Sequence, residues 1–125
     1  MSARILIVDD SSLARRTLRQ ILERDGHTVE DATDGAQAIE RYFINRPDIV
    51  LLDMVMEGMY GLEVLRKILE LDPEAKVVVA TADIQKATRD EVQAAGAAGI
   101  INKPFNQQEL NRVLTAVLQG DVTWS

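Results

Sequence analysis

The chain has 125 residues, of which 46% are hydrophobic and 27% are charged, so its length and composition indicate a single globular domain with its own core. The absence of cysteine excludes disulfides, thiolate metal sites and a thiol nucleophile. The net charge of −6 argues against direct binding of nucleic acid, because a phosphate backbone would be repelled.

The first predicted strand is the apolar run 5–8, close to the N-terminus. The run has only four apolar residues before Asp9. This stretch is too short for the core of a signal peptide or for a membrane span. We therefore expect a cytoplasmic protein with no membrane insertion.

A helix and a second strand follow. Apolar residues at helical spacing within 13–22 predict a helix with Ser11 or Ser12 as its N-cap and Gly26 as its stop. The next stretch, 28–31, mixes one valine with charged residues, as suits the edge of a sheet.

The rest of the chain repeats the same alternation. Three continuous apolar runs are typical of strands covered on both faces of a parallel sheet, and they occupy 49–52, 77–80 and 100–101. Four stripes of apolar residues at helical spacing lie at 36–43, 62–69, 84–95 and 110–118. Residues that stop helices follow the first three of these stripes: Asn45 with Pro47, Pro73 and Gly96.

Five strand–helix units in succession predict an α/β fold, with a parallel five-stranded sheet, right-handed crossovers and helices on both faces. In such sheets ligands bind beyond the carboxyl ends of the strands. No linker rich in glycine, serine or proline interrupts the pattern. We therefore expect one domain over residues 1–120, followed by a short tail over 121–125.

Polar side chains follow the four apolar strands at their carboxyl ends. They are Asp9 and Asp10, then Asp53, then Thr81, and finally Lys103. One aspartate after a strand is commonly a turn residue or a helix cap, but four strands that all end in this way indicate a site. Parallel strands bring these ends to one rim, where carboxylates repel each other unless a cation shares them. Oxygen ligands without histidine or cysteine favour Mg²⁺.

Formal charges make phosphoryl transfer the chemistry that this rim favours. Two acids and Asp53 carry −3, while Lys103 and one Mg²⁺ carry +3, so the resting site is balanced. Carboxylates are known covalent acceptors of phosphate. Positioned cations and a threonine hydroxyl such as that of Thr81 would stabilise the phosphoryl group on Asp53.

The residues resemble the receiver domain of two-component response regulators, over essentially the whole chain. The resemblance depends on four segments: Ile7-Val8-Asp9-Asp10, Leu51-Leu52-Asp53-Met54 with Met56, Gly58, Met59 and Gly61, Thr81-Ala82, and Lys103-Pro104-Phe105. It implies a flavodoxin-like (βα)5 three-layer sandwich with strand order 2-1-3-4-5. The type it resembles is the stand-alone, CheY-like receiver.

The resemblance also implies a role for each residue of the site. Asp53 would accept the phosphoryl group, and Lys103 and Thr81 would hold its oxygens. Asp10 and Asp53 would ligate Mg²⁺ together with the backbone carbonyl of Val55, and Asp9 would act largely through water. The Lys103–Pro104 bond is expected to be cis. The protein would catalyse only its own phosphorylation and dephosphorylation, and would not be an enzyme in the usual sense.

The implied partners are a sensor histidine kinase or a histidine phosphotransfer protein, and a downstream target protein. The target would contact the face formed by the fourth helix, fifth strand and fifth helix of a monomer. Ile100 departs from the family, which usually has tyrosine or phenylalanine there as a switch residue. Glu57 and Tyr60 depart from the usual proline and aspartate of the loop after the acceptor.

Two other classes of protein remain as alternatives. A receiver-like adaptor would act through protein contacts without phosphorylation, and the complete set of Asp53, Thr81 and Lys103 argues against it. An enzyme or cofactor protein of similar fold would be a flavodoxin or an aspartate-nucleophile phosphatase. The acidic first loop argues against a flavodoxin, since it would repel the FMN phosphate. The Arg15-Arg16 pair is interpreted as a solvated helix face, with kinase docking as its alternative.

Overall fold

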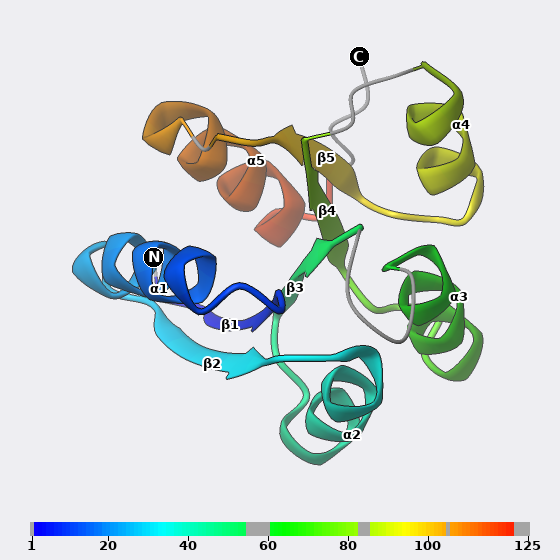
Figure 1. Cartoon of the computed structure of the whole chain (residues 1–125), viewed down its shortest axis with the longest axis horizontal. Helices are drawn as coiled ribbons and strands as arrows, with labels where there is room; N and C mark the ends of the chain where they lie inside the picture. The colour runs from blue at the N-terminus through cyan, green and yellow to red at the C-terminus, as the bar shows by residue number, and fades with distance from the viewer. Residues whose placement is uncertain (1, 55–60, 83–85, 105, 122–125) are drawn as a thin grey trace.

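The computed structural model describes residues 2–54, 61–82, 86–104 and 106–121. Strands and helices alternate along this part of the chain (Figure 1). Their bounds are β1 Arg4–Val8, α1 Ser12–Arg24, β2 Thr28–Ala32, α2 Gly35–Asn45, β3 Ile49–Asp53, α3 Gly61–Leu71, β4 Val77–Thr81, α4 Lys86–Ala94, β5 Gly99–Asn102 and α5 Gln107–Leu118. All strand pairs are parallel, and the strand order is β2-β1-β3-β4-β5. The predicted flavodoxin-like fold is confirmed.

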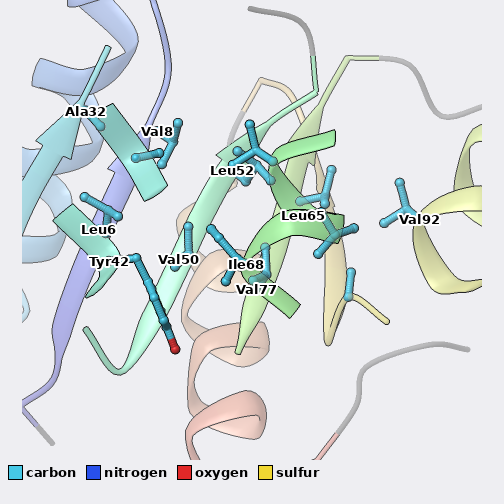
Figure 2. Packing of buried hydrophobic residues seen from close by; sticks show 14 of the residues in the cluster. Leu6, Val8, Ala32, Tyr42, Val50, Leu52, Leu65, Ile68, Val77 and Val92 are labelled. Atoms are coloured by element: carbon cyan, nitrogen blue, oxygen red, sulfur yellow. The ribbon is translucent and has the colours of Figure 1, made fainter. Parts of the chain in front are cut away.

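Helices cover both faces of the sheet because each central strand is apolar on both sides. Leu6 and Val8 of β1 enter a cluster with α2, α3 and α4, whereas Ile5 and Ile7 enter a second cluster with α1 and α5. Figure 1 shows α1 and α5 on one side of the sheet and α2, α3 and α4 on the other. Figure 2 shows the first cluster, where Leu65 and Ile68 of α3 pack over β3 and β4.

The helix boundaries follow local capping chemistry. Ser11 is the N-cap of α1, and its hydroxyl accepts a hydrogen bond from the Ala14 N–H, which decides between the two predicted serines. Gly26 follows the end of α1 with a φ of 92° that favours glycine. The predicted helix over 84–95 is observed as α4, and the first residues of the prediction lie outside the described part of the chain. None of the helices in the described segments has the length and hydropathy of a membrane span.

The predicted edge strand is confirmed as β2, which pairs only with β1 within the described sheet. The Asp9 N–H donates to the Ala32 carbonyl, so alternate residues of β2 face β1 and the residues between them face the open edge. Two outward carbonyls there, those of Val29 and Asp31, accept hydrogen bonds from Arg19 and Arg41 respectively. These guanidinium groups satisfy backbone acceptors that a sheet edge would otherwise expose.

The register of the sheet places the predicted site residues side by side. Val8 pairs with Leu52, so Asp9 and Asp53 come at the same level of adjacent strands. Asp53 pairs with Ala80 of β4, and Thr81 pairs with Asn102 of β5, one residue before Lys103. Residues at the carboxyl ends of four separate strands therefore meet at one rim.

Candidate functional site

Three carboxylates gather at the carboxyl rim of the sheet. Asp9, Asp10 and Asp53 each offer one oxygen atom, and these oxygens lie within 4.8 Å of one another. Asp9 is buried, Asp53 is partly buried, and Asp10 is exposed. The cluster therefore reaches from the interior of the domain to solvent.

Asp9 is fixed by contacts at every polar group. Its backbone N–H donates to the Ala32 carbonyl at 3.2 Å, and one carboxylate oxygen accepts from the Ser11 N–H at 2.9 Å. The other carboxylate oxygen accepts from Lys103 Nζ at 2.8 Å, and the Asp9 carbonyl accepts from the Arg15 guanidinium at 2.7 Å. Since Asp9 is only 3% exposed, these contacts compensate for the hydration that its charge loses.

Lys103 is the cation that faces the acids. Its Nζ lies 2.8 Å from an Asp9 oxygen and 3.3 Å from an Asp53 oxygen. Partial burial lowers the pKa of Lys103, but the hydrogen bond that its ammonium donates to Asp9 and the charges of Asp53 and Asp9 outweigh burial and raise it above its ordinary value of 10.5. Lys103 therefore stays charged at neutral pH. The Lys103–Pro104 bond is cis, as predicted.

Thr81 is the last residue of β4 and is only 2% exposed. Its carbonyl accepts a hydrogen bond from the Lys103 N–H at 2.9 Å, which ties the ends of β4 and β5 together. This bond holds Thr81 and Lys103 at the same end of neighbouring strands. The structure thus brings Asp9, Asp10, Asp53, Thr81 and Lys103 to one rim.

Gly61 packs directly against the backbone of Asp53 and Met54. Its N–H donates to the Met54 carbonyl at 2.8 Å, at the start of α3. A Cβ atom at this position would overlap the Asp53 carbonyl oxygen and would come within 2.7 Å of the Met54 Cα. Only glycine allows α3 to begin this close to the strand end that carries Asp53. The sequence marked Gly61 through a family motif but did not reveal this contact.

Replacing Gly61 by alanine is expected to lower the free energy of unfolding by about 3 kcal/mol, the upper end for overpacking, because backbone atoms must move. Urea denaturation measures this loss. Gly26→Ala is the control, since its added methyl group meets nothing within 4 Å and its positive φ alone should cost about 1 kcal/mol. Equal losses in the two variants would show that the start of α3 can move away from the Asp53 backbone at little cost in stability.

The donor set of the acidic cluster fits a hard divalent cation. The three acids carry −3 and Lys103 carries +1, so the group retains an excess of −2. All of the converging ligand atoms are carboxylate oxygens, which suit Mg²⁺ better than softer metals. A bound Mg²⁺ would therefore balance the charge of the cluster.

Several sequence interpretations fall on residues outside the described segments. They are the Val55 carbonyl as a metal ligand, the motif residues Met56, Gly58, Met59 and Phe105, and the unusual Glu57 and Tyr60. One interpretation of a described residue is wrong. The interpretation of the Arg15-Arg16 pair as a solvated helix face holds for the exposed Arg16 but not for Arg15, whose side chain is half-buried and reaches the Asp9 carbonyl.

Comparison with known proteins gives a consistent result. The profile of the response regulator receiver domain matches residues 5–115. Chemotaxis protein CheY of Thermotoga maritima is 38% identical over 118 residues, which are 94% of this chain and 98% of that protein. Response regulator MprA of Mycobacterium ulcerans is 39% identical over 95% of this chain, which spans only 51% of MprA. The crystal structure of a CheY-like response regulator receiver domain protein from Methanospirillum hungatei has a TM-score of 0.90 and 29% identity, over 96% of each chain.

Proposed function

The chain belongs to the response regulator receiver family, and from its site we propose that Asp53 accepts a phosphoryl group in a Mg²⁺-dependent reaction. One observation supports this most strongly. Lys103 Nζ lies within 3.3 Å of both Asp9 and Asp53, opposite a cluster of three carboxylates. Such a group of charges suits a phosphoryl group, whose oxygens need cations around them. We assign this activity to a domain over residues 1–120, with 121–125 as a tail.

The proposed step is an in-line displacement at phosphorus. A carboxylate oxygen of Asp53 attacks the phosphorus of a phosphohistidine on the donor. The phosphorus–nitrogen bond breaks, and its electron pair remains on the imidazole nitrogen of the donor. Asp53 then carries an acyl phosphate, which water later hydrolyses to inorganic phosphate, regenerating the carboxylate. The chain acts only on itself, as befits a signalling module and not an enzyme with a separate substrate.

Other side chains of the site stabilise the charge that moves to Asp53. The Lys103 ammonium is close enough to bind an oxygen of the phosphoryl group on Asp53, because it already contacts an Asp53 oxygen. The Thr81 hydroxyl would donate a hydrogen bond to a phosphoryl oxygen. Asp9, Asp10, Asp53 and the Val55 carbonyl would hold Mg²⁺, with Asp9 acting largely through water. When bound, Mg²⁺ would neutralise charge on the phosphoryl oxygens.

The proposed partners follow from this chemistry. A sensor histidine kinase or histidine phosphotransfer protein would donate the phosphoryl group in the cytoplasm, and a downstream target would bind a monomer on the face of α4, β5 and α5. Ile100 of β5 is 8% exposed and packs in the same cluster as Val79 and Val92. An aliphatic side chain there has no ring to turn inward, so we propose that the signal passes through the β4–α4 connection next to Thr81.

Mg²⁺ binding tests the metal part of the proposal. Millimolar Mg²⁺ should raise the melting temperature of the wild type more than that of Asp10→Asn, because ligand binding to the folded state stabilises it. Asp121→Asn makes the same charge change after the end of α5 and should keep the full shift. Differential scanning fluorimetry with and without Mg²⁺ gives all three values. Identical shifts in the wild type and Asp10→Asn would remove Asp10 from the ligand set.

A further inference from the structure

Arg15 and Arg16 are neighbours on α1 with different environments. The Arg15 side chain is half-buried and its guanidinium donates to the Asp9 carbonyl at 2.7 Å, whereas Arg16 is exposed. This hydrogen bond links the first turn of α1 back to the residue that directly follows β1. It therefore bridges the two ends of the β1–α1 connection, which carries two of the three clustered acids, Asp9 and Asp10.

We propose that Arg15 is a positioning residue for the acidic cluster. The Asp9 carbonyl belongs to the peptide bond that joins Asp9 to Asp10, and this bond is planar. Holding the carbonyl oxygen therefore restrains the orientation of the whole peptide unit, which includes the Cα atom that carries the Asp10 side chain. Asp10 itself is exposed and lies at the solvent side of the cluster. The proposal rests on the proposed function, since it concerns the same Mg²⁺ site.

Positioning and charge predict opposite effects when Arg15 is changed. A guanidinium bound to the Asp9 carbonyl brings a positive charge close to the site, so removal of its charge alone would tighten Mg²⁺ binding. Loss of the hydrogen bond would let the Asp9–Asp10 peptide unit rotate and would weaken binding. The bond is short, the Asp9 carboxylate is buried, and solvent screens a partly exposed guanidinium. Weaker binding is therefore the expected net result.

Isothermal titration with Mg²⁺ separates the two roles. Arg15→Ala should bind Mg²⁺ about tenfold more weakly, as is typical when a residue that supports metal ligands is lost. Arg15→Gln retains an N–H donor without the charge and should recover most of the affinity. Arg16→Ala removes the same charge from the exposed neighbour and should not weaken binding. Wild-type or tighter affinity in Arg15→Ala would overturn the proposal.

Hydrogen exchange of the metal-free proteins provides an independent readout. The Ser11 N–H donates to an Asp9 carboxylate oxygen at 2.9 Å, so its exchange reports whether Asp9 keeps its orientation. It should exchange faster in Arg15→Ala than in the wild type and Arg16→Ala, while amides of the central strands should not change. If the wild type bound no Mg²⁺, the proposed function would fail, and this exchange comparison would decide the role of Arg15. Unchanged Ser11 exchange would refute that role.

Discussion

Replacement of Lys103 by methionine should slow phosphorylation of Asp53 by acetyl phosphate about a hundredfold, a typical loss when one positioned electrostatic group is removed from a reacting site. The Lys103 ammonium contacts both Asp9 and Asp53, so its loss removes a positive charge from both carboxylates at once. The initial rate of phosphoryl incorporation at saturating Mg²⁺ measures the loss. Methionine keeps most of the apolar stem of lysine, so packing changes little.

The same variant should show two further effects with opposite signs. The free energy of unfolding without metal should fall by about 2 kcal/mol, because the buried Asp9 carboxylate loses a charged hydrogen-bond donor. Mg²⁺ should bind more tightly, because one positive charge has left the cluster. Lys67→Met is the matched control, since Lys67 is exposed on α3, and it should change none of the three quantities. A Lys103→Met protein that is phosphorylated at the wild-type rate would contradict this role.

The pH dependence of stability follows from the raised pKa of Lys103. A lysine that binds its proton more tightly in the folded state stabilises the fold fully below its unfolded pKa of 10.5. This contribution is lost as pH rises through the higher folded pKa. The stability difference between the wild type and Lys103→Met should therefore be constant from pH 7 to about pH 10 and shrink above it.

The fold could be predicted because each element carries its own local signal. Continuous apolar runs become β1, β3, β4 and β5, and the one polar stretch becomes the edge strand β2. The observed strands extend the predicted runs by a residue or so, because ladder hydrogen bonds continue into polar positions such as Asp53 and Thr81. An apolar run in the sequence locates the buried residues of a strand, but it does not show which residue makes the last hydrogen bond to the neighbouring strand.

The composition of the site could also be predicted, but the way in which it is held could not. Parallel topology alone requires that Asp9, Asp53, Thr81 and Lys103 meet at one rim. The sequence gives no sign of the Arg15 contact with the Asp9 carbonyl. An arginine on an amphipathic helix fits the same sequence pattern whether its guanidinium is solvated or hydrogen-bonded to the protein. The crowding of Gly61 against the Asp53 backbone likewise depends on how α3 packs.

Intact-mass measurement after incubation with acetyl phosphate and Mg²⁺ tests the assignment of Asp53 most directly. The wild type should gain one phosphoryl group, about 80 Da, by acyl phosphate formation. Asp53→Asn should gain none, although circular dichroism should show it folded, since it only removes one charge from an acidic cluster. Asp121→Asn should be labelled like the wild type. An unlabelled wild type would favour an adaptor that acts without phosphorylation, and equal labelling of Asp53→Asn would contradict Asp53 as the acceptor.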